Sequence, residues 1–412
     1  TSDASKLHND AAEPTPTNAA APSSNAARRD MRRLPVLDLA LWRSAPADFA
    51  SQLRHACHHH GFFQLRHRVP SGVVERAVAE AREFFARGAE HKRAIDYSQS
   101  PAFRGYMAVG VENTAGRCDH REQLEIAAEG APPPPAAWPP YTRLRGPNQW
   151  PASQPGLRVA IDDYTGHMLR VSAEVTCALC AALRLPSRAV GRYFSPAPHW
   201  QLKLAAYPPA PAAAAAGREG GAGERPVGVG AHTDSGWLTA LLQDEAGGLQ
   251  AFTQGEWADV PPLGLEYLVM NLGEVAEVAS GGDLRYGEIW GDMRRYGVVA
   301  EVASGGYLLA TPHRVLATAA PRLSVPFFYN PALEAVVEPL PLPAELCWER
   351  DAAYDAERHW RRPSNAMLRQ YGANALKSLA RSHPAVFAAH HPDLQVDEGG
   401  LVTAKCSPWL PA

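Results

Sequence analysis

The sequence lacks the features that mark membrane-spanning, secreted or nucleic-acid-binding proteins. No apolar run approaches the roughly 20 residues that a membrane-spanning helix needs, and residues 1–33 contain no apolar core like that of a secretory signal. The 40 Lys and Arg residues nearly balance the 43 Asp and Glu residues, so we expect no general attraction to nucleic acid or to an anionic membrane. We therefore expect a cytoplasmic protein without nucleic-acid or membrane partners, although the Ala- and Ser-rich N-terminus leaves an organellar address open.

Cysteine is also scarce. Six cysteines in 412 residues are too few for a disulfide scaffold and favour reduced, mostly buried thiols. Cys177 and Cys180 form a Cys-x-x-Cys pair, but they lie in an apolar stretch that is typical of a helix, and no second pair follows at zinc-site spacing. We interpret this pair as core packing.

Four regions follow one another along the chain. Residues 1–33 are rich in Ala, Pro, Ser, Thr and Asn, and we expect them to be disordered. Residues 34–185 predict short strands with helices over 46–60, 71–90 and 156–184. Residues 186–345 hold short runs of Val, Leu, Tyr and Phe between Gly and Pro turns, which predicts a mainly β jelly-roll core. Residues 346–412 predict a C-terminal helical region and tail.

Two insertions interrupt the predicted core. Residues 208–228 are a low-complexity Pro, Ala and Gly segment that we interpret as a loop between strands. Farther on, the hexapeptide that begins at Glu277 recurs identically from Glu301, at an offset of 301 − 277 = 24 residues. One repeat is too few for a solenoid. We interpret residues 277–300 as a local insertion with a duplicated edge.

Three short motifs carry the chemistry, in the order His232-Thr233-Asp234, Pro312-His313-Arg314-Val315 and Arg322-Leu323-Ser324. Residues two apart on a strand face the same way, so His232 and Asp234 are expected on one inner face, with His313 arriving from a predicted strand at 307–310. Two histidines and one carboxylate can bind one face of Fe(II) and leave its other positions open. These residues predict a metal centre.

A carboxylate clamp is predicted next to this metal centre. Arg322 offers a planar fork of donors and Ser324 a hydroxyl on the same strand face. Tyr207 adds a phenolic donor, and Lys203 shares its strand face at a two-residue step. We expect these side chains to hold a small organic acid, and Lys203 to line the same cavity.

These motifs resemble the isopenicillin N synthase-like branch of the Fe(II)/2-oxoglutarate-dependent dioxygenases. The resemblance covers about residues 34–390 and includes further landmarks such as Tyr207-Pro208-Pro209, Gly248-Leu249-Gln250 and Asn271-Leu272-Gly273. It implies a double-stranded β-helix core, iron bound by His232, Asp234 and His313, and 2-oxoglutarate held by Arg322, Ser324 and Tyr207. It also implies an enzyme that uses O2 to hydroxylate, desaturate or cyclise a small molecule, releasing succinate and CO2, with ascorbate as an additional reductant. We expect the protein to be a monomer.

Two departures from the family leave alternatives open. Ala205 stands where members often carry Asn, which weakens the expected keto-acid binding, and the 24-residue insertion precedes His313. Some relatives use no 2-oxoglutarate, so an oxidase that needs only Fe(II) and O2 is one alternative. A metabolite-binding sensor whose centre the insertion has damaged is the other.

Other residues are weaker candidates. Arg104 and Tyr106 precede a predicted loop over the barrel mouth, and Phe328 follows the clamp strand, so each is weighed as a substrate contact against simple packing. We interpret His58-His59-His60 as a helix end, where histidine meets the C-terminal dipole. The histidines near His383 and His390 are assigned to a surface helix.

Overall fold

The computed structural model describes residues 33–114, 117–210, 227–281, 284–286, 300–302, 306–346, 367–397 and 400–405. All elements below lie in the compact unit that begins at Leu34. The predicted disorder of residues 1–33, apart from Arg33, most of the loop at 208–228, and the inner part of the insertion at 277–300 lie outside the described residues.

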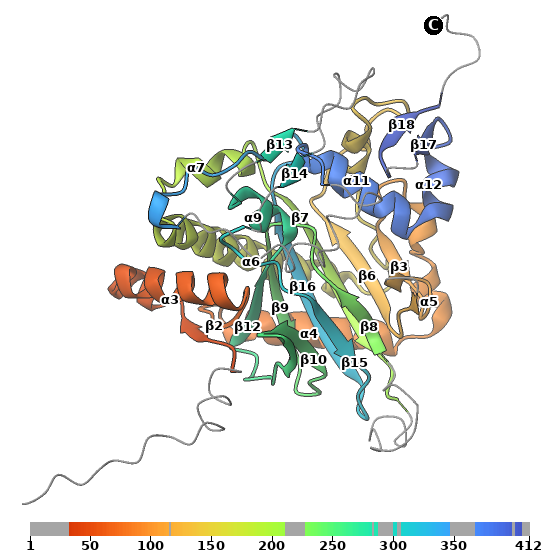
Figure 1. Ribbon diagram of the computed structural model, residues 1–412. Coiled ribbons are helices and arrows are strands. Elements are labelled where there is room, and N and C mark those ends of the chain that lie inside the picture. The colour runs from red at the N-terminus through yellow and green to blue at the C-terminus, as the bar shows by residue number, and fades with distance from the viewer. Residues whose placement is uncertain are drawn as a thin grey trace, which may run out of the picture. The chain divides into compact units, whose positions relative to one another are not determined.

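A major sheet of eight strands forms the centre of the molecule (Figure 1). The pair at one edge is parallel and every other pair is antiparallel. The order across the sheet is β1 (Val36–Asp38), β2 (Phe62–Arg66), β12 (Tyr267–Leu272), β9 (Leu238–Gln243), β16 (Arg322–Asn330), β7 (His199–Tyr207), β6 (Glu122–Ala127) and β3 (Gly105–Met107).

A minor sheet of four antiparallel strands faces the major sheet. Its order is β11 (Glu256–Asp259), β10 (Leu249–Thr253), β15 (His313–Leu316) and β8 (Val227–His232). Val229, Ala251 and Val315 from this sheet pack in one cluster with Tyr207 and Val269 from the major sheet. Apolar side chains between two facing sheets are the core of a jelly roll, which confirms the predicted double-stranded β-helix fold.

Helices cover the opposite face of the major sheet (Figure 1). On β7, Leu202 and Leu204 point to this helical side and are fully buried, whereas Lys203, Ala205 and Tyr207 alternate with them toward the interior of the jelly roll. The helices are α2 (Leu41–Ser44), α3 (Pro46–His59), α4 (Ser71–Ala86), α5 (Ala89–Arg93), α6 (Pro155–Ala182) and α7 (Arg188–Gly191), with 3-10 turns at Tyr97–Gln99, Pro140–Leu144, Arg192–Phe194 and Ala344–Leu346.

The sequence located the main helices of this layer closely. The predicted helices over 46–60, 71–90 and 156–184 correspond to α3, to α4 followed by α5, and to α6. The Cys-x-x-Cys pair lies in α6 as expected, but only Cys180 is buried, while Cys177 is exposed. Thus the prediction of core packing is correct for one of the two thiols.

The C-terminal region is partly helical. It contains α11 (Tyr371–Ser382) and α12 (Pro384–His390), followed by a hairpin of β17 (Leu394–Val396) and β18 (Val402–Ala404) that the sequence did not predict. A second small hairpin, β4 (Asn113–Thr114) with β5 (Arg117–Cys118), lies beside β8, where the Gly230 backbone approaches Thr114. Among the described residues, none of the helices combines the length and the hydrophobicity that spanning a bilayer requires.

The predicted insertion leaves and re-enters the core at one point. Helix α9 (Glu274–Ala279) precedes it, and the Tyr307 amide donates to the Ser280 carbonyl at 3.1 Å where the chain returns. Within it, β13 (Leu284–Tyr286) pairs antiparallel with β14 (Ala300–Val302) (Figure 1). The excursion therefore closes on itself before the chain continues toward His313.

The prediction of a strand at residues 307–310 is wrong. The Leu308 amide donates to Ser280 Oγ at 2.9 Å and the Ala310 amide to Glu277 Oε2 at 2.8 Å, so these backbone groups bond to side chains near α9 and not to a neighbouring strand. Strand β15 begins only at His313.

Candidate active site

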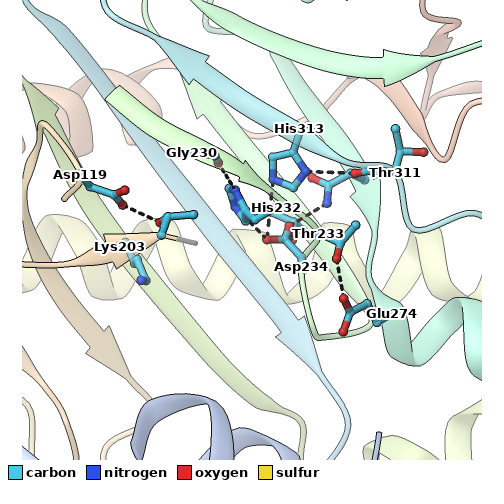
Figure 2. A network of polar contacts seen from close by, with 12 residues as sticks. Asp119, Lys203, Gly230, His232, Thr233, Asp234, Glu274, Thr311 and His313 are labelled. Carbon is cyan, nitrogen blue, oxygen red and sulfur yellow. Dashed lines mark hydrogen bonds and ion pairs between the residues drawn. The ribbon is translucent and has the colours of Figure 1, made fainter. Parts of the chain in front are cut away.

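Three potential metal ligands converge at the end of the minor sheet (Figure 2). His232 is the last residue of β8 and pairs in register with His313, the first residue of β15. Asp234 lies in the loop between β8 and β9. Its Oδ1 atom is 3.8 Å from His232 Nε2 and 3.7 Å from His313 Nε2.

These distances fit a single metal ion. Two atoms that each bind one ion at about 2.1 Å can lie no more than about 4.2 Å apart, and both distances to Asp234 meet this limit. The ligand atoms of all three residues lie within 4.8 Å of one another. Two imidazoles and one carboxylate on one side of an ion leave its remaining positions open for small ligands.

The backbone reason for this convergence differs from the prediction. We expected His232 and Asp234 to alternate on one strand, but β8 ends at His232 and Asp234 occupies the following loop. Helix α9 holds that loop, because the Glu274 amide donates to the Asp234 carbonyl at 2.7 Å. Thr233 points away from the cluster and donates a hydrogen bond to the Glu274 carboxylate (Figure 2).

The backbone also fixes the tautomers of both histidines. His232 Nδ1 lies 2.8 Å from the Gly230 carbonyl, and His313 Nδ1 lies 3.1 Å from the Thr311 carbonyl. A carbonyl only accepts hydrogen bonds, so each Nδ1 carries the proton and each Nε2 presents its lone pair. Burial, together with the neighbouring His313 and against the opposing effect of Asp234, lowers the pKa of His232 to about 4. His232 is therefore neutral and able to bind a metal at physiological pH.

Hydrogen bonds also fix the orientation of the Asp234 carboxylate. Its Oδ2 atom accepts hydrogen bonds from Thr239 Oγ1 at 2.6 Å and from Asn271 Nδ2 at 2.7 Å, which leaves Oδ1 facing the two imidazoles. Burial alone would raise the pKa of Asp234. The two histidines, with Thr239 and Asn271, outweigh burial and hold that pKa below its usual range. The carboxylate is therefore ionised.

The predicted clamp residues lie together on neighbouring strands. Arg322 on β16 pairs with Tyr207 on β7, and its guanidinium lies 4.7 Å from the centroid of the tyrosine ring. Arg322 Nε donates to the Gly247 carbonyl at 2.8 Å, and Nη1 donates to Ser324 Oγ at 3.0 Å. Among the described residues, the buried Nη2 atom of Arg322 has no hydrogen-bond partner. A buried charged donor without a partner is costly, and a carboxylate would satisfy it.

Lys203 lies on the same inner face of β7 but is bound to two carboxylates. Its Nζ atom is 2.7 Å from Glu125 Oε1 and 3.1 Å from Glu112 Oε1. Glu112, Glu125 and His383 form a second group with metal-ligand spacing. Because the Lys203 ammonium already lies between the two carboxylates, a positive charge of the protein takes the position that a metal ion would need.

The remaining predicted substrate contacts differ in their placement. Phe328 shares the inner face of β16 with Ser324, so it lies on the correct side of the sheet. Arg104 is buried and donates to the Leu144 carbonyl at 3.0 Å and to the Gly146 carbonyl. It also lines a small cavity with Glu125.

Tyr106 lies on the helical side of the major sheet. Its ring packs against Phe84, and its hydroxyl donates to Glu122 Oε2 at 2.6 Å. Tyr106 pairs with Leu124, which pairs with Leu204 on the helical face. Tyr106 therefore points away from the face that carries Tyr207. The structure therefore gives the predicted substrate contact of Tyr106 no support.

The other histidine clusters have structural partners. His58 Nδ1 lies 2.7 Å from the Tyr307 carbonyl and His60 Nδ1 lies 3.1 Å from Thr253 Oγ1, at the end of α3 as expected. His383 and His391 are buried, not on a surface helix as predicted. Their burial follows from contacts with the segment around Phe103.

Sequence reasoning missed three residues of the site. Thr239 and Asn271 orient Asp234, and Arg121 contacts Tyr207. Asn271 was recognised only as part of the Asn-Leu-Gly landmark. Each of these residues is far from its partner in the sequence or lacks a spacing signal, so only the strand pairing reveals it.

Comparisons with known proteins show which families the chain is similar to. Residues 34–153 match the family described as "non-haem dioxygenase in morphine synthesis N-terminal", and residues 192–331 match the family described as "2OG-Fe(II) oxygenase superfamily". The chain is 32% identical to the 2-oxoglutarate-dependent dioxygenase frbJ of Dothideomycetidae sp. (strain 11243), over 86% of this chain and 90% of that protein. It is 27% identical to homoarginine-6-hydroxylase 2-ODD-C23.1 of Arabidopsis thaliana, over 76% of this chain and 88% of that protein.

Solved structures show the same fold. A putative 2OG-Fe(II) oxygenase family protein from Caulobacter crescentus superposes with a TM-score of 0.61 at 22% identity, over 84% of this chain and 98% of that one. The dioxygenase for auxin oxidation in rice superposes with a TM-score of 0.53 at 24% identity, over 78% of this chain and 89% of that one.

Proposed function

The chain belongs to the 2OG-Fe(II) oxygenase superfamily and is an Fe(II)- and 2-oxoglutarate-dependent dioxygenase, and on this premise we propose which residues perform the reaction. His232, Asp234 and His313 bind the iron. Arg322, Ser324 and Tyr207 hold the distal carboxylate of 2-oxoglutarate. The substrate is a small organic molecule that enters the interior of the jelly roll, and its oxidation accompanies release of succinate and CO2.

One observation carries this proposal. Two imidazoles with fixed tautomers and one fixed carboxylate present three ligand atoms toward a common point, and each is held by a hydrogen bond to its other polar atom. Such partners orient metal ligands and raise their basicity. These hydrogen bonds leave Nε2 of each histidine and Oδ1 of Asp234 oriented toward one another, as the ligands of a single ion would be.

The chain's own residues order the reactants. Iron, when bound, supplies the redox chemistry that couples keto-acid decarboxylation to oxidation of the substrate. The clamp places one end of the keto acid on Arg322, whose free donor and planar fork suit a carboxylate. Because Tyr207 also packs against the Gly228 backbone of β8, the clamp lies beside the strand that carries His232.

The type of oxidation and the substrate contacts form the finer part of the proposal. Hydroxylation and desaturation use the same iron site, so the pocket wall decides between them. Lys203 and Phe328 face the interior and are the wall residues we propose. A monomeric state without nucleic-acid or membrane partners remains a prediction, which sedimentation analysis of the full chain tests.

An anaerobic Fe(II) titration with and without 2-oxoglutarate tests the assignment. We expect a visible charge-transfer band that needs both Fe(II) and the keto acid, followed by stoichiometric succinate after O2 is added. Asp234→Ala is expected to abolish the band, and Arg322→Met to shift it to much higher keto-acid concentration. Iron binding without band or succinate would instead favour the keto-acid-independent oxidase or the sensor, and wild-type iron affinity in the Asp234→Ala protein would refute the ligand assignment.

A further inference from the structure

Arg121 is a buried arginine that the proposed site has not used. It directly precedes β6, and only 10% of its side chain is exposed. Its Nη2 atom lies 2.5 Å from Glu112 Oε2 and 3.1 Å from Asp119 Oδ2. A guanidinium buried with two carboxylates is held in place, because movement away from either partner would leave an unpaired buried charge.

The Arg121 guanidinium also reaches the clamp. It donates a hydrogen bond to the phenolic oxygen of Tyr207. Arg121 precedes Glu122, and Tyr207 follows Ala206, the partner of Glu122 across β6 and β7. Burial raises the pKa of Tyr207, but Arg121 and Arg322 outweigh burial and lower that pKa below its ordinary value. Two guanidinium groups therefore act on one phenol, one at its hydroxyl and one at its ring face.

A chain of alternating charges supports Arg121. Glu112 binds Arg121 through Oε2 and Lys203 through Oε1, and Lys203 in turn binds Glu125. These groups lie on the inner side of β6 and β7 or in the segment before them. Since every one of these charges has an opposite partner, the network gives Arg121 one preferred position.

The hydrogen bonds of the clamp show why the position of Arg121 matters for the Tyr207 hydroxyl. A hydroxyl has one proton to donate, and an arginine can only donate. Ser324 Oγ accepts from Arg322, and the Tyr207 oxygen accepts from Arg121, so the proton of each hydroxyl is left for another acceptor. The two hydroxyls also form a hydrogen bond with each other. A bound carboxylate offers two acceptor oxygens, one for each proton.

We propose that Arg121 is a positioning residue of the keto-acid clamp, which fixes the Tyr207 hydroxyl as a donor toward the distal carboxylate of 2-oxoglutarate. This inference rests on the proposed function, since it assumes that Arg322, Ser324 and Tyr207 hold this carboxylate. Arg121 acts through Tyr207 and is not assigned a contact with the keto acid.

Isothermal titration of the metal-loaded protein under anaerobic conditions tests the proposal. Two keto acids are compared: 2-oxoglutarate, which has the distal carboxylate, and 2-oxobutyrate, which lacks it. We expect Arg121→Gln to weaken 2-oxoglutarate binding about tenfold, the effect of losing one charge-assisted hydrogen bond. The affinities for Mn(II) and for 2-oxobutyrate should stay at the wild-type level. Arg121→Lys keeps the charge and should show a smaller loss of the same kind.

A double-mutant cycle shows whether Arg121 acts through Tyr207. In a Tyr207→Phe background, both Arg121 variants should cause no further loss of 2-oxoglutarate affinity, because the acceptor is already gone. Arg143 serves as a matched control, since it is a buried arginine paired with Asp393 away from the clamp. Arg143→Gln should lower thermal stability and leave both keto-acid affinities unchanged.

The outcomes distinguish failure of the proposed function from failure of the proposed role of Arg121. If wild-type protein binds no 2-oxoglutarate, the proposed function fails. If the wild-type protein binds 2-oxoglutarate, three results would refute the role of Arg121. The Arg121→Lys and Arg121→Gln variants could weaken binding of both keto acids equally, or weaken binding of neither. They could also cause their full loss of affinity in the Tyr207→Phe background. Should Arg121→Gln not fold, the comparison of Arg121→Lys with the Tyr207→Phe cycle decides alone.

Discussion

At the scale of single residues, the proposed iron site depends on polar atoms that form hydrogen bonds to the ligand side chains. Oδ1 of Asp234 faces the two imidazoles because Thr239 and Asn271 bind Oδ2. His232 and His313 are oriented in the same way by backbone carbonyls, which substitution of a side chain cannot remove. Asn271 is therefore the most informative of these partners to mutate.

We expect Asn271→Ala to weaken Fe(II) or Mn(II) binding about 10–100-fold, the usual effect of losing a partner of a metal ligand. The carboxylate would keep one hydrogen bond and gain freedom to rotate away from the two imidazoles. Anaerobic metal titration measures the effect. Asn374→Ala is the control, because Asn374 is also a buried amide but bonds to the backbone of Leu368. An equal loss of metal affinity in both variants would contradict the assignment.

His199 predicts an acid-sensitive stability that is independent of the metal. Burial, with Arg104 and Arg145 nearby, lowers its pKa to about 3 in the folded protein, against about 6.5 when unfolded. Below pH 6.5 the unfolded chain binds a proton that the folded protein does not bind, so the free energy of unfolding falls as the pH drops toward 3. The contribution at pH 5 is about 2 kcal/mol relative to pH 7.5.

The variant His199→Gln cannot titrate and should lose this part of the pH dependence. Urea unfolding of the metal-free protein at pH 5 and pH 7.5 measures the slope, and substitution of the exposed His120 by Gln should leave it unchanged. If His199→Gln retained the full wild-type slope between the two pH values, protonation of His199 would not be the cause.

At the scale of elements, α9 connects the two halves of the metal site. Its first turn holds the Asp234 loop, and Glu277 in its last turn accepts from the Ala310 amide just before β15. The same helix ends at Ala279, next to Ser280, where the excursion starts and the chain returns. For this reason the described contacts around His313 are independent of the length of the excursion.

We expect removal of residues 283–306 to leave a folded protein with metal and 2-oxoglutarate affinities within about threefold of the wild type. The deletion joins Gly282 to Tyr307, so the existing hydrogen bond from Tyr307 to Ser280 would close a four-residue turn with two central glycines, which such turns favour. Circular dichroism and the keto-acid titration measure the result.

A slightly larger deletion provides the matched control. Removing residues 281–306 takes away both glycines and joins Ser280 directly to Tyr307, so no turn can form. We expect that protein to unfold or to lose metal affinity. If the shorter deletion also lost metal binding, the excursion itself would contribute to the site.

The elements also show what the sequence could and could not predict. Helical periodicity located α3, α4 and α6, and short apolar runs between Gly and Pro turns indicated the strands of the core, because these signals are local. The His-x-Asp motif correctly paired His232 with Asp234 in space, but for the wrong reason, since a loop held by α9 replaces the expected strand. The contact between Arg121 and Tyr207 depends on the pairing of β6 with β7, and no periodicity in either segment records that pairing.

At the scale of the whole molecule, the metal site connects the two sheets. His232 and His313 belong to the minor sheet, while Asp234 leads into β9 of the major sheet and Asn271 belongs to β12. An ion bound by all three ligands would therefore resist separation of the sheets. The clamp has the same property, because Tyr207 on the major sheet packs against β8.

We therefore expect metal and 2-oxoglutarate to raise the melting temperature in succession. A ligand that binds only the folded state at 100 times its Kd adds about 2.7 kcal/mol, which corresponds to a shift of several degrees for a chain of this size. Scanning calorimetry under argon measures both steps. Asp234→Ala should lose both shifts and Arg322→Met only the second; a metal shift retained in Asp234→Ala would place the ion elsewhere.

The hydrogen bond that closes the chain between Ser280 and Tyr307 makes this junction a suitable site for inserting another domain. Identical hexapeptides flank the excursion, and the chain leaves and returns at one hydrogen bond, so the core does not depend on what lies between. A foreign domain whose own termini lie close together meets the same requirement. A fluorescent domain placed there would follow α9, the helix that holds the Asp234 loop, and we expect it to leave the fold of the core unchanged.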